Sequence, residues 1–187
     1  TGRYALDGFG TQNSAIAAGG AVPNYNNLKA LTEEWNGTNW SEVNDLPYNA
    51  WYFGAAGDSS ESGIVFGGSY GVYGTATAKT SLWIGTNWSE VADMNTARIY
   101  MGGQGSTNNA IGVGGQTPSD FSTCTETWDG TSWSVEASMI VANRYARVGG
   151  NGNGAIVAGL SQEASPYSNT NSELFESSIN TGSFGRV

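Results

Sequence analysis

The chain has 187 residues, and only 12% of them are charged while glycine alone contributes 28, a composition that favours short strands and turns over helices. Its formal net charge of −9 disfavours the phosphate backbone of a nucleic acid and an anionic membrane as partners. The lack of histidine removes the commonest general base and zinc ligand, and a single cysteine, Cys124, excludes an internal disulfide.

A glycine that ends an apolar stretch recurs at nearly constant intervals along the chain. Gly67 follows Gly19 by 48 residues, Gly114 comes 47 residues later, and Gly159 comes after another 45. The segments before these glycines are alike, since RYALDGFGTQNSAIAAGG in the first copy matches RIYMGGQGSTNNAIGVGG in the third. Such periods indicate a repeat architecture. We predict one domain over residues 1–187, which could be a segment of a longer protein, with repeats at about 1–48, 49–96, 97–142 and 143–187.

Each repeat is predicted to form four antiparallel strands. In the first repeat they cover residues 3–9, 14–20, 31–36 and 39–43. Apolar and aromatic residues fill these stretches, and Gly, Asn and Ser separate them, as is typical of strands joined by turns. The loop between the second and third strands is longer and differs from repeat to repeat.

A tight turn with tryptophans on both sides joins the third and fourth strands. The sequence WNGTNW of the first repeat returns as WIGTNW and as WDGTSW, so six of the seven tryptophans lie in such pairs. The turn glycines Gly37, Gly85 and Gly130 are expected to have positive φ, which places each tryptophan pair directly across the hairpin. We therefore expect the pairs to be structural, and expect Trp40→Ala to cost about 3–5 kcal/mol.

Stacking around an axis would bury both faces of such four-stranded units, which no unit can do alone. The predicted fold is all-β, a β-propeller of four-stranded antiparallel blades. Three features recur in register: a Gly-Gly that ends the second strand, a step from an acidic to an aromatic residue on the third strand, and a tryptophan on the fourth strand. They are carried by Gly19-Gly20, Gly67-Gly68, Gly114-Gly115, the steps from Glu33 to Trp35, Glu126 to Trp128 and Glu173 to Phe175, and the fourth-strand tryptophans. In these features the repeats resemble the kelch family, which implies four kelch-like repeats of about 47 residues over essentially the whole chain. Among the departures from the kelch pattern are Ser81 in place of the acidic residue and Phe184 in place of the last tryptophan.

A second resemblance concerns context. The ending NTGSFGRV, residues 180–187, looks like a connector in structural proteins of marine bacteriophages, where it leads into further β-rich tail or fibre modules. Repeats of the WNGTNWSEV type are likewise similar to kelch-like repeats in such virion proteins. This resemblance implies a place in a virion, outside the cell.

Catalytic chemistry is not expected. The kelch relatives that oxidise galactose need copper held by His and Tyr, and this chain has no His. The acidic turns at 57–62 and 129–132 offer oxygen ligands for Ca²⁺, but turn capping by Asp, Asn and Ser explains both. We expect no enzyme activity, no cofactor and no metal.

Aromatic residues in the variable loops are candidates for ligand contact. They are Tyr25, Tyr70, Tyr73, Phe121 and Tyr167, each surrounded by short polar side chains, and all but Tyr70 are predicted to contact a ligand. Flat rings beside amides and hydroxyls suit sugar recognition, because rings stack on C–H faces while amides bond hydroxyls. The alternative is that these aromatics pack the loops onto the blade edges.

Three scarce arginines precede the first strand of a repeat, namely Arg3, Arg98 and Arg144, and Trp51 takes this place in the second repeat. The first strand of a propeller blade is the innermost, so these positions are expected around the mouth of the axis. A cluster of guanidinium groups there could hold a carboxylate. The alternative is a structural role, for which the kelch pattern also uses a basic residue.

Together these features predict a non-enzymatic structural or adhesion module of a phage virion, in a tail fibre, spike or capsid decoration. Its partners would be other virion proteins or a glycan or protein of the host surface, with no nucleic acid and no membrane insertion. One alternative is a carbohydrate-binding propeller, and another is an intracellular kelch scaffold for protein interactions. Any ligand is expected on the face formed by the variable loops and the inter-repeat connections.

Overall fold

The protein is all-β. The computed structural model describes residues 2–23, 27–71, 75–159, 172–177 and 183–186, which form four four-stranded antiparallel sheets and a two-stranded sheet. These described residues include no helix, and so none that is long and apolar enough to span a membrane. The predictions of an all-β chain and of four antiparallel strands in each repeat are therefore confirmed.

The sheets follow the repeats, one sheet for each. Sheet 1 consists of β1 (Asp7–Thr11), β2 (Ser14–Ala18), β3 (Thr32–Trp35) and β4 (Trp40–Val43). Sheet 2 consists of β6 (Gly54–Ser59), β7 (Ser62–Phe66), β9 (Thr80–Trp83) and β10 (Trp88–Glu90). Sheet 3 consists of β11 (Gly102–Ser106), β12 (Asn109–Val113), β13 (Thr125–Trp128) and β14 (Trp133–Val135). Sheet 4 consists of β15 (Arg147–Asn151), β16 (Gly154–Ala158), β17 (Ser172–Glu176) and β18 (Ser183–Arg186). The small sheet pairs β5 (Ala50–Trp51) with β8 (Ser69–Tyr70).

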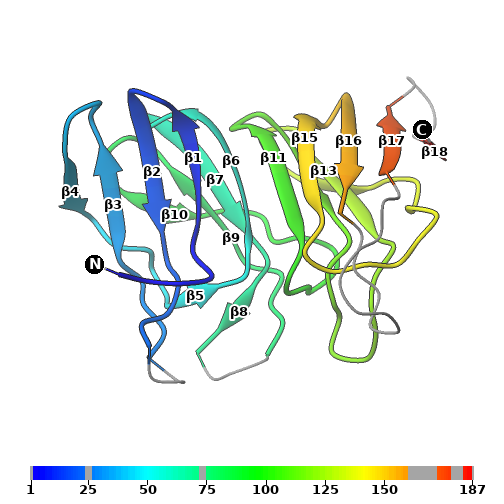
Figure 1. Ribbon diagram of the computed structural model, residues 1–187, viewed down its shortest axis with the longest axis horizontal. Helices are drawn as coiled ribbons and strands as arrows, with labels where there is room; N and C mark the ends of the chain where they lie inside the picture. The colour runs from blue at the N-terminus through cyan, green and yellow to red at the C-terminus, as the bar shows by residue number, and fades with distance from the viewer. Residues whose placement is uncertain (1, 24–26, 72–74, 160–171, 178–182, 187) are drawn as a thin grey trace.

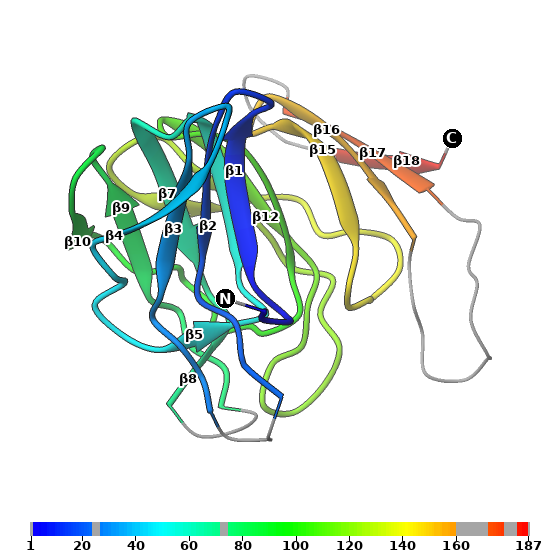
Figure 2. The ribbon, with the colours of Figure 1, turned by 60° about the vertical axis from the view of Figure 1, so that its left-hand side comes forward.

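The four sheets stand side by side in chain order, from sheet 1 in blue to sheet 4 in orange and red (Figures 1 and 2). Their first strands, β1, β6, β11 and β15, pack one against the next and form what we call the central edge. No comparable packing joins sheet 4 back to sheet 1 among the described strands, so the sheets form an open arc.

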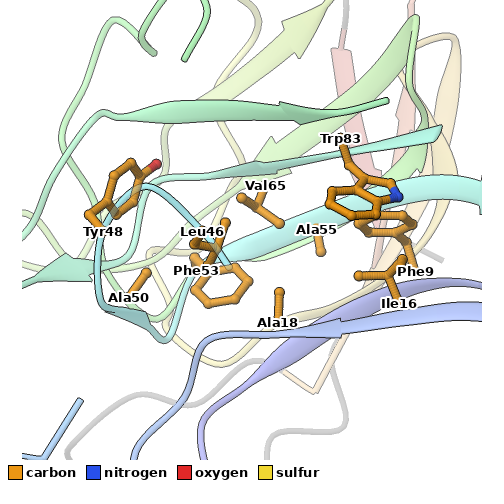
Figure 3. Close-up of a cluster of buried hydrophobic side chains, with 10 residues drawn as sticks. All are labelled: Phe9, Ile16, Ala18, Leu46, Tyr48, Ala50, Phe53, Ala55, Val65 and Trp83. Atoms are coloured by element: carbon orange, nitrogen blue, oxygen red, sulfur yellow. The ribbon is translucent and has the colours of Figure 1, made fainter. Parts of the chain in front are cut away.

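The core lies between neighbouring sheets. We call the side of a sheet that faces the following sheet its forward face and the opposite side its backward face. Phe9 and Ile16 on the forward face of sheet 1 meet Val65 and Trp83 on the backward face of sheet 2 (Figure 3). Similar clusters join sheet 2 to sheet 3 and sheet 3 to sheet 4. Burying apolar surface stabilises a fold by about 25 cal/mol per Å², so these interfaces are the main source of stability.

The tryptophan pairs lie where the sequence placed them. Trp35 is directly opposite Trp40 in the hairpin, and their ring centroids are 5.6 Å apart. The corresponding pairs in sheets 2 and 3 have centroids 5.2 and 5.5 Å apart, and the three turn glycines have φ of 89°, 79° and 98°. The predicted turn geometry is confirmed.

The two members of each pair have different roles. The third-strand tryptophan ties its own sheet together, since Trp83 Nε1–H donates to Ser60 O at 2.6 Å. The fourth-strand tryptophan reaches the preceding sheet, since Trp133 Nε1–H donates to Thr80 Oγ1 at 3.0 Å. Trp40 in sheet 1 makes no such contact with another sheet among the described residues, and it is 51% exposed. The expected cost of 3–5 kcal/mol for Trp40→Ala is therefore wrong, because such costs apply to buried side chains.

Candidate functional site at the axial mouth

Backbone hydrogen bonds link four residues that lie just before the first strands, at one end of the central edge: Ala5, Tyr52, Tyr100 and Tyr145. Tyr52 N–H donates to Ala5 O at 3.0 Å, Tyr100 N–H to Tyr52 O at 3.0 Å, and Tyr145 N–H to Tyr100 O at 2.8 Å. All four residues have positive φ, between 52° and 61°. Residues other than glycine rarely adopt this conformation, which costs about 1–3 kcal/mol. Its repetition in every sheet shows that the packing of the sheets fixes these residues in place.

This series of hydrogen bonds brings three tyrosine rings into contact with one another. The centroids of Tyr52 and Tyr100 lie 4.5 Å apart, those of Tyr100 and Tyr145 lie 4.8 Å apart, and those of Tyr52 and Tyr145 lie 5.8 Å apart. Tyr145 is 43% exposed, while the other two are half-buried. We call this cluster the tyrosine trio and the opening that it borders the axial mouth.

Arg144 joins the trio to a loop of sheet 3. Its guanidinium carbon lies 5.4 Å from the ring centroid of Tyr145, 5.8 Å from that of Tyr100 and 5.1 Å from that of Phe121. Its Nη1 also donates to Gln116 Oε1 at 3.5 Å. Two residues that the sequence predicted for a ligand site, Arg144 and Phe121, are thus brought together beside three tyrosines that it did not single out.

A pocket of about 280 Å³ lies at the axial mouth. It is lined by the trio and by residues of the first strands, among them Asp7 of β1 and Arg147 of β15. Burial raises the pKa of Asp7 to about 6, although the Gly8 N–H that donates to its carboxylate and the charge of Arg147 both oppose this rise. The pocket therefore combines aromatic surface with one carboxyl group and one guanidinium.

The phenol of Tyr145 is neutral at physiological pH. Burial raises the pKa of Tyr145 to about 12, and the neighbouring phenols of Tyr100 and Tyr52 act in the same direction. A neutral phenol both donates and accepts hydrogen bonds, while its ring offers flat apolar area. Such a surface can stack on the C–H face of a sugar or on an apolar side chain of a protein.

Arg98 is committed to the interior of sheet 3. Its side chain is fully buried, with Nη1 donating to Gly114 O at 2.7 Å and to Cys124 O at 2.8 Å, and Nη2 to Glu126 Oε1 at 3.0 Å. Glu126 also accepts bonds from the connection between sheets 2 and 3, including the N–H of Asn95 at 2.6 Å. The pair therefore holds this connection against the sheet.

Arg3 has the same role in sheet 1. Its Nη1 donates to Gly19 O at 2.9 Å and to Leu31 O at 2.6 Å, and its Nη2 pairs with Glu33. The side chain of Arg3 is buried, so its charge is already matched inside the sheet. For Arg3 and Arg98 the structure favours the structural role that the sequence left open over anion binding.

The structure also corrects the alignment of the arginines between repeats. Gly20 N–H donates to Ala50 O, Gly68 N–H to Arg98 O, and Gly115 N–H to Asn143 O, each at 2.7 Å. Ala50 and Asn143, rather than Trp51 and Arg144, therefore occupy the position of Arg98. In sheet 2 the cause is a bulge between Gly57 and Ser59, which adds one residue to the strand and shifts the count.

Trp51 is not part of the mouth surface. It is buried in β5, packs with Ala21 and Leu28, and places its ring centroid 6.2 Å from that of Tyr4. Its expected role in ligand contact is therefore corrected to core packing. Three other residues predicted for ligand contact lie outside the described residues: Tyr25, Tyr73 and Tyr167.

A sequence signal for the trio was present. Tyr52, Tyr100 and Tyr145 occur in WYFG, IYMG and RYAR, each shortly before a first strand. Aligning Arg3, Arg98 and Arg144 by residue type shifted the last repeat by one position relative to the others. In that alignment Tyr145 no longer matched Tyr100, so the recurrence of tyrosine was missed.

No family model matches the chain, and no curated protein matches it. Among solved structures the chain is similar to YjhT, with a TM-score of 0.76 and 13% sequence identity. The match covers 92% of this chain and 66% of that chain, so the chain spans less than two thirds of its neighbour. In fold, the chain is an all-β protein of four-stranded antiparallel sheets like those of the β-propeller-like YjhT.

Proposed function

We propose that the chain is a segment of a kelch-like β-propeller and acts as a non-enzymatic adhesion or structural module of a phage virion. A tail fibre, a spike and a capsid decoration are the places that this role fits. Support comes from the likeness in fold to a β-propeller-like protein and from the resemblance of the repeats and of residues 180–187 to phage structural proteins. Its localisation would then be the virion, outside the cell.

The tyrosine trio is the observation that carries an adhesive role. Three sheets each contribute one tyrosine in a strained backbone conformation, and the rings meet beside the 280 Å³ pocket. Tyrosine is favoured in contact surfaces because it offers large, rigid area and a polar tip at a low entropic cost. Strain of this kind often marks a contact site.

Binding to whole cells tests this proposal. Fluorescently labelled chain is added to a panel of marine bacteria and measured by flow cytometry. We expect binding to at least one strain, and we expect Tyr145→Ser to weaken it about tenfold. Tyr70→Ser is the matched control, because Tyr70 is an exposed tyrosine in β8. Equal loss in the two variants, or no loss with Tyr145→Ser, would contradict contact through the axial mouth.

A carbohydrate-binding role is the second candidate, and the composition of the mouth favours it. The trio, Phe121 and the Gln116 side chain combine stacking surface with amide and phenol groups that bond hydroxyls. A glycan array separates this reading from adhesion to a protein. Loss of array binding with both Tyr100→Ser and Tyr145→Ser supports it, and an array without any signal rules it out.

Arg144 allows the charge of a ligand to be tested. Its guanidinium is held over three rings at the mouth, whereas Arg98 is fully buried. Arg144→Gln is expected to weaken acidic glycans and to leave neutral ones unchanged. Equal weakening of both would assign Arg144 to the shape of the mouth rather than to charge recognition.

A further inference from the structure

Two faces of the arc remain uncovered. The first is the forward face of sheet 4, where Ile156 is 52% exposed. The residues at the same position of sheets 1, 2 and 3 are Ile16, Ile64 and Ile111, and each is at most 1% exposed. The difference has a simple cause, since a following sheet covers each of these three. No described strand follows sheet 4 in the arc (Figure 2), so nothing described covers Ile156.

The second uncovered face is the backward face of sheet 1. A hollow of about 450 Å³ opens there and extends past β1 to β6 and β11 at the central edge; its sheet 1 lining includes Gly8, Gly10, Ala15, Ala17 and Trp40. In sheet 2 the matching face is filled, because the ring of Phe9 from sheet 1 lies over its glycines. A Cβ atom added to Gly57 or Gly63 would come within 2.5 or 2.2 Å of this ring. The small residues of sheet 1 therefore form a seat for a large side chain that the described residues do not provide.

A hydrogen bond recurs at the interfaces of the arc. Trp88 Nε1–H donates to Thr32 Oγ1 of the preceding sheet at 3.0 Å, and Trp133 Nε1–H donates to Thr80 Oγ1 at 3.0 Å. Trp40 on sheet 1 carries the donor half of this bond. Ser172 on sheet 4 stands at the threonine position, since it pairs with Ala158 as Thr80 pairs with Phe66. Each open face thus carries one half of the same interface.

Size and shape indicate what covers the two faces. The four sheets match 66% of YjhT, which leaves a third of that fold, or about the share of two sheets. A second copy of this chain would bring four sheets into that space. It also fits poorly, because sheet 4 has Gly149 and Ala158 where sheets 1 and 2 have the ring-bearing Phe9 and Phe66.

We propose that two further repeats of the same kind, carried by the same polypeptide, cover both faces and complete the arc. The repeat before sheet 1 places a large apolar side chain in the glycine-lined hollow and a hydroxyl group against Trp40 Nε1. The repeat after sheet 4 covers Ile156 and Leu174 and directs a tryptophan to Ser172. The axial mouth is then bordered on all sides.

An extended chain tests the proposal. Two additional copies of residues 49–96 are appended to the 187-residue chain, because sheet 2 carries both Phe66 with Thr80 on its forward face and Trp83 with Trp88 on its backward face. The solvent accessibility of Trp40 is measured by acrylamide quenching of its fluorescence. The contribution of Trp40 is the difference between the emission of the protein and that of its Trp40→Phe variant. We expect at least threefold less quenching in the extended chain, a higher urea midpoint and a monomer by light scattering. Ala17→Glu with Ile156→Glu should abolish these gains in the extended chain and leave the shorter chain unchanged.

Three results would overturn the proposal. One is unchanged quenching of Trp40 while circular dichroism and protease resistance show that the added repeats are folded. Another is protection of Trp40 in a dimer of the 187-residue chain, which would assign the faces to a second copy. The third does not depend on the folding of the fusion: a complete reading frame that encodes this chain and no further repeat.

Discussion

Trp40 and Trp133 occupy the same position in sheets 1 and 3, yet their surroundings differ. Trp40 is 51% exposed and Trp133 only 7%. Trp133 lies against the ring of Phe66 at a centroid distance of 4.7 Å and donates to Thr80, and both partners belong to the preceding sheet. A tryptophan of this repeat therefore gains its energetic role from the neighbouring sheet and not from its own hairpin.

The largest expected effect follows from this difference. Trp133→Ala should lower the free energy of unfolding by about 3–5 kcal/mol, because it empties a buried volume and removes a hydrogen bond. Trp40→Ala should cost only about 1 kcal/mol, the value of its contact with Trp35. Urea denaturation of both variants measures this, and losses of equal size would show that the hairpin itself determines the energy.

The second comparison concerns the arginine pairs of sheets 3 and 1. Arg98→Met should cost about 3 kcal/mol, because it leaves the charge of Glu126 buried without its partner. Arg3→Met should cost about half as much, because the Glu33 side chain is 21% exposed and water can solvate it. The double variant Arg98→Met/Glu126→Gln should recover part of the first loss, and no recovery would contradict the charge argument.

These cases show which parts of the structure could be predicted from the sequence. The repeat, the strands and the tryptophan hairpins follow from local patterns, since Gly37 and its equivalents determine the turn by themselves. The exposure of Trp40 could not be predicted from its hairpin, because it depends on whether another sheet packs against the backward face of sheet 1. Identical local sequences can therefore have different energies.

The candidate site was predicted only in part, for two physical reasons. Arg3 and Arg98 look like surface charges until their carboxylate partners are known, and these lie about thirty residues further along the chain. The bulge at Asp58 adds a residue that no pattern in the sequence indicates, so Trp51 instead of Ala50 was aligned with Arg98. Phe121 and Arg144 were found because their residue types alone suggest ligand contact.

A third comparison uses threonines at equivalent positions of sheets 2 and 3. Thr80 accepts the indole N–H of Trp133, so Thr80→Val leaves a buried donor unpaired and should cost about 1–2 kcal/mol. The buried Thr125 hydroxyl has no hydrogen-bond partner among the described residues, and Phe184 replaces the tryptophan that would reach it. Thr125→Val should therefore be neutral or slightly stabilising. Thermal melts of the two variants measure this. Similar losses of stability would contradict the argument that the threonine stabilises an interface only where it accepts a tryptophan N–H.

The smallest expected effect concerns charge at the central edge. By strand register, Asp7, Gly54, Gly102 and Arg147 share one position, so the outer sheets carry opposite charges where the inner sheets carry glycine. The pKa of Asp7 is raised from 3.8 to about 6, mainly by burial. The folded state therefore binds a proton more tightly than the unfolded state between about pH 4 and 6.

Linkage gives the sign of the pH dependence: this carboxyl group makes the free energy of unfolding fall as the pH rises from about 4 to 6, and its contribution is constant above that range. Asp7→Asn removes the contribution and should stabilise the fold by about 1 kcal/mol at pH 7, with little gain at pH 4. This is less than the roughly 3 kcal/mol of a two-unit pKa shift, because the Asp7 side chain is only half-buried and water screens part of its charge. Arg147→Gln should have the opposite effect and extend the fall in stability to higher pH, because the charge of Arg147 lowers the pKa of Asp7. Urea midpoints of the three proteins from pH 4 to 8 measure this. A gain for Asp7→Asn that is equal at pH 4 and pH 7 would contradict the raised pKa of Asp7 and would mean that its charge costs the fold nothing.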